Sequence, residues 1–541
     1  MKKILALILA LVMCFGLVAC GNDQSDADAG KDSSAAGEKV VNVAVTGDPG
    51  SLSPWVANNG GRINTLLEVY QHLVEADGFG GPMTGVIMES YEQVDERTFD
   101  MTIRDNVYDT AGNQIKASDV VFSYQTDIDM GFHAGRLGTI ESMEVISDFV
   151  VRWKFKNVPN DGDLCNVWIE SYIVSEKAYK DSGDEMAMNA VGTAPYKVRE
   201  YVPGSHLTLE KAESYWQNSG DVLSFFGANA DVINFKFITD VSQIATGLKT
   251  GEVDMTNTIA AMDLPAFQDG GEYADDFDAV EVVANPAYML GFNCSEDSVC
   301  SNVNLRKAIA YAINADQLVD GVLGGAGFRF NAFGNPKYGD YNDNWGKDGY
   351  FEYNMDEAKK YLDAFTKETG MKPGDVNLTL VLKEGNYTLG QEMTEAIQGF
   401  LMALGLNATI STQPATSYTD FINNSENWDL GLICDNGASK DYLISWLQNV
   451  MLPDYYPHEG GQLFIEDEEF IALVRECYSI DGHTAENMDK LNDMINDNCY
   501  IYGLCGYYEY FVTADWVTSV VNENRNCIFP GGCTYDWAAK G

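Results

Sequence analysis

The chain has 541 residues, of which 45% are hydrophobic, and its 34 Lys and Arg residues stand against 81 Asp and Glu, a formal charge of −47. A chain of this length is too long for one hydrophobic core, so two or three compact units are expected. Nucleic acids and anionic lipid headgroups require clustered Lys and Arg, so the negative charge argues against both as partners. It would weakly favour cationic ligands, although a solvated acidic surface is the simpler interpretation.

The first residues have the pattern of a lipoprotein signal peptide. Lys2 and Lys3 precede an apolar run over 4–19, which is too short for a membrane-spanning helix of ~20 residues. Leu17-Val18-Ala19-Cys20 is similar to a lipobox, in which the cysteine is acylated and becomes the first residue after cleavage. Two acyl chains, at ~0.8 kcal/mol per buried CH₂, would anchor a soluble protein durably. We therefore predict a signal peptide over 1–19 and lipidation of Cys20; an ordinary signal peptide with an incidental cysteine is the alternative.

A polar segment separates this leader from the rest of the chain. Residues 21–39 contain no aromatic and no β-branched residue, so they cannot bury enough apolar surface to fold. We predict a flexible tether over 20–39. Folded structure is expected from Val40, where valines alternate with other residues over 41–45 as in a strand.

Four further elements are predicted before residue 125. A loop with two prolines and two glycines covers 46–55, and a helix is predicted over 63–72. Apolar and polar residues alternate over 99–103, which is the period of a half-buried strand. Ser118 and Asp119 suit the start of a helix, where backbone N–H groups favour oxygen and negative charge.

The stretch 91–125 resembles the signature of extracytoplasmic solute-binding protein family 5, the dipeptide- and oligopeptide-binding lipoproteins of bacterial ABC importers. Further segments resemble the same family along most of residues 40–450. The segments that carry the resemblance are Glu89-Ser90-Tyr91, Asp95-Glu96-Arg97-Thr98-Phe99, Ile103-Arg104, the run 117–124, Val191-Gly192-Thr193-Ala194-Pro195-Tyr196, Tyr215-Trp216, Gly251-Glu252-Val253-Asp254 and the run 305–328. One departure is Gln71, which stands where the family has Glu.

The resemblance implies an α/β chain with the type II periplasmic-binding-protein fold, in which two lobes flank a ligand cleft and an extra domain is inserted. The implied domains are a discontinuous lobe I over 40–70, 191–285 and 506–541, an inserted domain over 71–190, and lobe II over 286–505. The lobes would close on a ligand about a hinge of crossing strands, and a permease would read the closed shape.

The segment 428–442 departs from the family in an informative way. Many peptide-binding members have F-D-x-x-x-x-x-W-x-A-D-Y-x-D-P here, and the Asp of A-D-Y pairs with the α-ammonium of the peptide. A carboxylate serves because an ammonium that leaves water needs an opposite charge and hydrogen-bond acceptors. In this chain the strand 430–434 is retained, but A-D-Y becomes Gly437-Ala438-Ser439 or shifts to Asp441-Tyr442. Asp435 could replace the family's Asp, or it could be a solvated loop residue.

The candidate ligand contacts come from the loop after the first strand, from the end of the strand at 293 and from 433–436. An extended peptide would use main-chain hydrogen bonds to strands and place its side chains in wet pockets. The predicted ligand-binding residues are Trp55, Asn58, Asn59, Asn293, Ile433, Cys434, Asp435 and Asn436. For each of them a purely structural role is the alternative.

The chain has 11 cysteines, of which Cys14 would leave with the signal peptide and Cys20 would carry the lipid. Three pairs share one spacing, with five residues between the two cysteines: Cys294/Cys300, Cys499/Cys505 and Cys527/Cys533. Such a pair can close a disulfide loop outside the cytoplasm. The alternative is that all of them are small buried hydrophobic residues. No C-x-x-C occurs, so a zinc ribbon or thioredoxin motif is not expected.

The sequence contains no pattern for catalysis or for a metal. It has no G-x-S-x-G, H-E-x-x-H or P-loop, and its five histidines are scattered. Residues 340–349 resemble a calcium loop superficially, but an EF-hand needs Gly at its sixth position and an acid at its twelfth, where this chain has Trp345 and Phe351. We therefore predict no catalytic residue, no metal site and no cofactor.

The resemblance implies a substrate-binding lipoprotein of an ABC importer that captures di- to oligopeptides outside a bacterial, Gram-positive cell. Its partners would be the solute, the permease subunits and, through the lipid anchor, the extracytoplasmic face of the cell membrane; no nucleic acid is expected, and the protein would be a monomer. Alternatives are a binder of an oligosaccharide, opine or metal complex in the same fold, or a receptor for a peptide signal.

Overall fold

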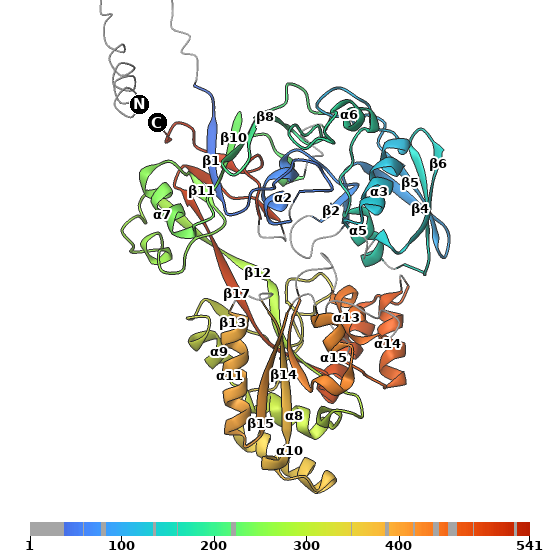
Figure 1. Ribbon diagram of the computed structural model, residues 1–541, viewed down its shortest axis with the longest axis vertical. Coiled ribbons are helices and arrows are strands. Elements are labelled where there is room, and N and C mark those ends of the chain that lie inside the picture. Colours follow the sequence, from blue (N-terminus) through green and yellow to red (C-terminus); the bar gives the residue numbers. More distant parts are fainter. Residues whose placement is uncertain are drawn as a thin grey trace, which may run out of the picture. The chain divides into compact units, whose positions relative to one another are not determined.

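The computed structural model describes residues 37–57, 59–76, 83–133, 137–159, 161–217, 223–347, 349–384, 389–414, 417–435, 443–452, 463–479, 481–523 and 527–540. The chain divides into two compact units, residues 1–38 and 39–541, and the elements labelled in Figure 1 belong to the second. The predicted signal peptide, Cys20 and the predicted tether up to residue 36 lie outside the described residues. Among the described residues there is no helix with the length and apolar character that a membrane crossing requires.

Eleven strands of the described chain form one mixed sheet. Their order is β15 (Asn407–Gln413), β14 (Asn377–Lys383), β16 (Leu430–Asp435), β12 (Phe277–Phe292), β17 (Ile501–Ala514), β11 (Met255–Thr256), β1 (Val40–Val45), β10 (Val232–Phe237), β9 (His206–Lys211) and β8 (Tyr196–Val202), with β13 (Gly327–Arg329) pairing with β17 off this path. The predicted first strand is confirmed as β1, in which Val41, Val43 and Val45 are buried.

Two groups of parallel strands lie within this sheet. β1 runs parallel to β10 and β11, and β14 runs parallel to β15 and β16. Parallel neighbours place their carboxyl ends side by side, and ligands of open α/β sheets bind outside such ends. The chain that follows β1 and β11, and the chain that follows β14, β15 and β16, therefore mark two edges where a ligand site is expected.

Two long antiparallel strands, β12 and β17, connect these groups. They pair over 277–291 and 501–514, and Figure 1 shows them side by side along their length. β11 of the first group pairs with β17, and β16 of the second group pairs with β12. β12 contributes Val282 to one hydrophobic core and Ala284 to another, and its register against β17 shifts before Ala287. The two cores are thus joined through one continuous pair of strands.

A separate four-stranded antiparallel sheet has the order β4 (Met88–Asp95), β5 (Thr98–Ile103), β7 (Val150–Phe155) and β6 (Ile140–Ser147). The alternation predicted over 99–103 is confirmed, because Phe99, Met101 and Ile103 are buried. The opposite face is polar: Arg152 donates from Nε and from an Nη to the two oxygens of Asp100, both at 2.7 Å. One face on a core and one face in water is the usual state of an antiparallel sheet.

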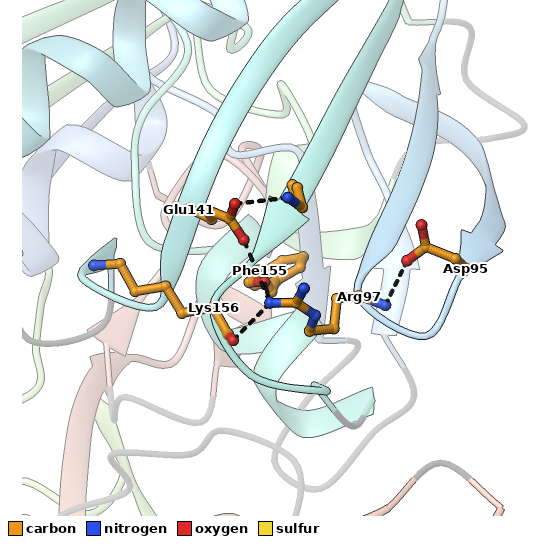
Figure 2. Close-up of polar contacts among 6 residues, drawn as sticks. Asp95, Arg97, Glu141, Phe155 and Lys156 are labelled. Carbon is orange, nitrogen blue, oxygen red and sulfur yellow. Dashed lines mark hydrogen bonds and ion pairs between the residues drawn. The ribbon is translucent and has the colours of Figure 1, made fainter.

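Arg97, in the turn between β4 and β5, ties the ends of this sheet together (Figure 2). Its backbone N–H donates to Asp95 Oδ1 at 2.9 Å, and its guanidinium reaches the carbonyl of Lys156 at 3.0 Å and a carboxylate oxygen of Glu141 at 3.4 Å. Lys154 also binds Glu141, at 2.6 Å. A short segment of the family signature therefore has a structural task here, which is to close the hairpin against β6 and β7.

Helix α3 (Ala117–Met130) begins close to the predicted position. The residue preceding it is Lys116, two residues before the predicted Ser118, and the Asp119 carboxylate accepts from the N–H of Lys116 at 2.8 Å. The same carboxylate accepts from the N–H of Glu176 at 2.8 Å, at the start of α6 (Glu176–Asp181). Burial raises the pKa of Asp119. One acid thus holds the starts of two helices.

The helix predicted over 63–72 is wrong in its second half. Helix α2 covers Asn59–Thr65 and a 3-10 turn covers Leu66–Glu68. Beyond this turn the carbonyls bond to other segments: that of Val69 accepts from Ala194 and that of Gln71 accepts from Ile173, both at 3.0 Å. The side chain of Gln71 donates to the hydroxyl of Tyr215 at 2.8 Å and accepts from an indole N–H at 3.0 Å. Tertiary hydrogen bonds therefore replace the helical ones.

The other helices lie mostly around the second group of strands and its connections. They are α5 (Asp161–Trp168), α7 (Val241–Thr250), α8 (Val303–Ala312), α9 (Ala315–Gly321), α10 (Met355–Thr369), α11 (Gly390–Ala403), α12 (Tyr418–Ile422), α13 (Leu443–Met451), α14 (Glu468–Tyr478) and α15 (Ala485–Asn498). The run 305–328, which resembles the family, lies in part in α8, where Leu305 and Ile309 are fully buried.

The described cysteines are all thiols. They are Cys165, Cys294, Cys300, Cys477, Cys499, Cys505, Cys527 and Cys533, and each is buried except Cys294, which is half-buried. The three equally spaced pairs therefore contain no disulfide in this structure. Burial raises the pKa of Cys294 to about 11 and that of Cys499 to about 12, so these thiols are held in their unreactive, protonated form.

The last residues of the chain are fixed against β1. The ammonium of Lys540 donates to the carbonyl of Val40 at 2.6 Å and to Asp254 Oδ2 at 2.8 Å. The same oxygen of Asp254 accepts from the backbone N–H of Asn42 at 2.8 Å. Lys540 also lies 4.3 Å from the ring centre of Trp516. Lys540 is therefore hydrogen-bonded to β1 both directly and through Asp254.

Glu68 is a carboxyl group inside the core that contains β1. Its side chain is 2% exposed, one oxygen accepts from the N–H of Gly531 at 2.9 Å, and the other has no hydrogen-bond partner among the described residues. Burial raises the pKa of Glu68 from 4.5 to about 8, and this effect outweighs the bond from Gly531. The acid is therefore neutral at neutral pH.

This burial predicts a loss of stability in alkaline solution. The pKa of Glu68 is about 8 in the folded state and 4.5 in the unfolded chain. The stabilising contribution of its neutral form to the free energy of unfolding is therefore fully present below pH 4.5 and is lost as the pH rises through 8. Each pKa unit corresponds to ~1.4 kcal/mol, so the melting temperature of the wild type should fall by several degrees more between pH ~6 and ~9 than that of Glu68→Gln. Thermal unfolding across this range tests the expectation, and parallel pH profiles for the two proteins would contradict it.

Candidate functional site

The loop after β1 is held rigidly at the carboxyl end of that strand. Asp48 accepts from the N–H of Gly50 at 2.7 Å and from the hydroxyl of Tyr201 at 2.6 Å. The N–H of Leu52 donates to Ala187 at 2.9 Å. Helix α2 then passes so close that a Cβ on Gly61 would lie 2.3 Å from the nitrogen of Pro49. The loop is therefore a preformed platform beside the first group of parallel strands.

Trp55 anchors this loop. Its side chain is 2% exposed, its indole N–H donates to Ser171 Oγ at 2.9 Å, and its ring meets those of Phe122 and Tyr179 edge to face. Val56, next in the chain, is the exposed apolar residue, with 54% of its surface accessible. The predicted ligand contact of Trp55 stays a prediction. Of its predicted neighbours, Asn58 and the side chain of Asn59 lie outside the described residues.

Asn293 lies directly beyond the end of β12 and is fully buried. Its amide N–H₂ donates to the carbonyls of Ser425 and Trp428, both at 2.7 Å, and its oxygen accepts from the N–H of Ser295 at 3.0 Å. These bonds hold the turn before β16 against the end of β12. A ligand contact by Asn293 remains a prediction, because the bonds described here are all internal.

The other predicted contacts lie in β16 or just after it. Ile433 is 4% exposed and belongs to the core formed with α13 and α14, and it lies opposite Met289 of β12. The backbones of Cys434 and Asp435 pair with Tyr288 and Ala287, while their side chains and all of Asn436 lie outside the described residues. Asp435 is thus the last residue of β16, at the carboxyl end of the parallel strands β14 and β16, where a ligand site is expected.

Sequence reasoning missed two polar groups at the carboxyl edges. After β11, Asn257 donates to the side-chain oxygen of Asn64 in α2 at 2.8 Å, and both residues are half-exposed. Thr256 fixes this turn by donating to the carbonyl of Ala44 at 3.1 Å. No pattern in the sequence could have found this pair, because β11 has two residues and gives no periodic signal.

The second missed group is Lys383, the last residue of β14. It lies two residues beyond Val381, which pairs with Gly431 of β16. Its ammonium lies 5.8 Å from the ring centre of Tyr418, which is buried. A half-exposed cation therefore stands at the carboxyl end of the second group of strands, next to the strand that ends at Asp435.

The described histidines lie against carboxylates. His133 contacts Asp127 at 2.8 Å and Glu170 at 3.2 Å, and His72 bonds to Glu75. One hydroxyl, Ser205 Oγ, lies 3.0 Å from a ring nitrogen of the adjacent His206, in an exposed turn between β8 and β9. The described residues contain no cluster of three His, Cys, Asp or Glu suited to a metal. Among the described residues these are pairwise contacts within helices, turns and loops.

Comparison with known proteins identifies the family. Residues 83–448 match the family model "Bacterial extracellular solute-binding proteins, family 5 Middle". The chain belongs to this family. It is 24% identical to the oligopeptide-binding protein OppA of Bacillus subtilis, over 97% of both chains, and 24% identical to the dipeptide-binding protein DppE of the same organism, over 84% of this chain and 82% of that one.

Solved structures agree with this assignment. The crystal structure of a nickel ABC transporter from Bacillus halodurans superposes with a TM-score of 0.73 at 17% identity, covering 92% of this chain and all of the other. The present chain therefore has the type II periplasmic-binding-protein fold, with two lobes around a ligand cleft and an extra inserted domain. The β12–β17 pair joins the two groups of parallel strands.

The bonds of Asn293 predict a large structural effect of its removal. Asn293→Ala would leave two carbonyls and one N–H without their partner inside the protein, so we expect a loss of roughly 2–4 kcal/mol in the free energy of unfolding. Urea unfolding measures it. The matched control is Asn304→Ala, because the Asn304 amide bonds to the exposed Glu368 and should cost less than ~1 kcal/mol. Equal losses for the two variants would contradict the structural role.

Proposed function

We propose that this protein is the peptide-binding component of an ABC importer. It captures di- to oligopeptides outside the cell and delivers them to a membrane permease. The observation that carries the proposal is full-length similarity to a protein named for oligopeptide binding, together with similarity over most of the chain to one named for dipeptide binding. Lipidation at Cys20 would keep the protein at the extracytoplasmic face of a Gram-positive membrane, and it would act as a monomer that needs no cofactor and catalyses no reaction.

The domain boundaries follow as part of this proposal. Lobe I comprises 40–70, 191–285 and 506–541, the inserted domain 71–190, and lobe II 286–505. In support, one hydrophobic core draws on β1, β10 and the four-stranded sheet, and two other cores draw on β14, β16 and the helices α8 to α15.

Peptide capture would use the two carboxyl edges. On the lobe I side, Asn257 and Asn64 carry amide donors and acceptors that match the main chain of an extended peptide. On the lobe II side, Asp435 would receive the α-ammonium, and Lys383 supplies a positive charge for a carboxylate. Closure about β12 and β17 would bury the ligand, and only a ligand that binds the closed state better than the open one can shift this equilibrium.

A non-peptide solute is the second candidate. One solved relative is a nickel ABC transporter, and this chain departs from the family's ammonium-binding segment at 437–439. An oligosaccharide, an opine or a metal complex would therefore be held in the same fold with different side chains. A receptor for a peptide signal would have the same structure, and permease and ATPase genes beside this one would instead favour import.

A thermal-shift screen of the body from residue 40 tests the peptide proposal. A ligand at ~100 times its Kd should add ~2.7 kcal/mol to the free energy of unfolding. We expect pools of short peptides to raise the melting temperature and N-acetylated peptides to lose the effect, because the ammonium site is removed. A shift with sugars or nickel–histidine complexes, but not with peptides, would overturn peptide capture.

Substitution of Asp435 refines this test. If its carboxylate binds the peptide ammonium, Asp435→Asn should weaken binding about 10- to 100-fold, since hydrogen bonds to charged groups contribute ~1.5–3 kcal/mol. Isothermal titration with a tripeptide measures the change. Asp420→Asn is the control, because Asp420 is an exposed acid in α12 of the same lobe. Unchanged affinity in Asp435→Asn would remove Asp435 from the site.

A further inference from the structure

Helix α13 begins with a capping group supplied from far away in the chain. The Asp340 carboxylate accepts from the N–H of Leu443 at 2.6 Å with one oxygen and from the N–H of Ile444 at 3.0 Å with the other. The two partners are 103 and 104 residues away in sequence. A carboxylate at this end satisfies backbone donors and interacts favourably with the helix dipole. Both effects are stronger than they would be for a solvent-exposed carboxylate, because the Asp340 side chain is only 4% exposed.

The Asp340 carboxylate is itself held in place. The ring nitrogen Nε2 of His483, in the connection between α14 and α15, lies 3.3 Å from Asp340 Oδ2. Further along the same loop, Asn342 and the indole of Trp345 donate to Asp489 Oδ1 at 2.8 and 2.7 Å. The loop is thus fixed to α15 (Ala485–Asn498), and the cap has little freedom to move with α13.

The start of α13 lies in the same hydrophobic core as the lobe II half of the candidate site. Leu443, Ile444 and Leu447 are fully buried in the same core as Ile433 of β16 and Met289 of β12. In the same loop as the cap, a Cβ on Gly334 would lie 2.6 Å from a methyl of Leu443, and Gly334 has a φ of +83°. Glycine is therefore required for this close packing of loop on helix.

From these contacts we propose that Asp340 is a positioning residue of the ligand site. It fixes the first turn of α13, where Leu443 packs on Gly334. The N–H of Gly334 donates to the sulfur of Met289, which lies opposite Ile433. Through this shared core the first turn of α13 fixes the carboxyl end of β16. Asp340 acts through the helix and touches no ligand. This inference rests on the proposed function, because it takes the carboxyl end of β16 as the place where the solute is bound.

The role explains the residue types in the 340–349 loop, which resembles a calcium loop in sequence. The first acid of that pattern, Asp340, accepts hydrogen bonds from the start of α13 with both carboxylate oxygens, and one of these oxygens also contacts His483. The third-position residue, Asn342, donates its amide to Asp489 and accepts from the N–H of Asn344 at 3.0 Å. Acids and amides that would be ligands in a cation loop are here used for capping and for turn formation.

The test compares Asp340→Ala and Asp340→Asn with a matched capping residue. Asp467 caps α14 in the same lobe by accepting from the N–H groups of Glu469 at 3.1 Å and Phe470 at 3.0 Å. Asp467→Ala therefore removes a similar helix cap, together with a bond from the Tyr500 hydroxyl at 3.1 Å, and none of these bonds reaches α13 or β16. Two readouts are used: trialanine affinity by titration calorimetry, and amide hydrogen exchange over 431–433 and 443–447 without ligand.

We expect both alanine variants to lower the melting temperature, but Asp340→Ala alone to weaken trialanine binding tenfold or more. Asp340→Asn keeps one acceptor and should lie between wild type and Asp340→Ala, so a folded intermediate variant is available if the alanine variant fails to fold. Exchange at 431–433 should rise at least tenfold in Asp340→Ala and stay at the wild-type level in Asp467→Ala.

Two results would overturn the inference. One is an equal loss of affinity in the two alanine variants, which would make it an effect of stability alone. The other is unchanged exchange at 431–433 in the Asp340 variants, which would show that the cap does not position β16. If wild type fails to bind trialanine, the peptide proposal is weakened, and the exchange readout still decides the positioning role.

Discussion

The pairing of β12 with β17 is the constraint on which this architecture depends. These two strands are long enough to enter both cores. Within the main sheet, β11 of the first group pairs with β17 and β16 of the second group pairs with β12, so the two groups are joined through β12 and β17. The two strands are hydrogen-bonded along most of their length, and the ladder is irregular at two places, between Val283 and Ala287 and between Tyr288 and Met289, so a bend between the cores is expected there. A bend confined to a few residues is what a hinge between two lobes requires.

The two candidate edges are built on different supports. The loop after β1 is held by bonds from its own residues to different segments, through the side chains of Asp48 and Trp55 and the backbone N–H of Leu52. The edge after β16 is held by α13, whose start depends on a carboxylate from another loop. A binding site assembled from preformed supports loses little conformational entropy when a ligand arrives, which favours affinity.

Much of the fold could be predicted from the sequence, because the family signature extends through β4, β5 and α3 and because the alternating valines of β1 give a clear period. The end of the helix at 66–72 could not be predicted, since Val69 and Gln71 exchange helical bonds for bonds to Ala194 and Ile173 that are remote in sequence. For the same reason the site was only partly predicted. Asn64 and Asn257 meet through tertiary structure, and Lys383 has no pattern around it. Asn293 was chosen for its place at a strand end, but nothing in the sequence shows that three internal bonds already occupy its amide.

The contact of Lys540 with Val40 and Asp254 has a mechanical consequence. A lipid-anchored protein would be pulled through its N-terminal chain, and this load would enter the body at Lys39 and run along β1. β1 lies between β10 and β11, parallel to both, so a pull along its axis shears many hydrogen bonds at once and does not open them one after another. The ammonium of Lys540 closes the end of the strand where the force arrives. The body is therefore built to resist force at the point where an anchored chain would apply it.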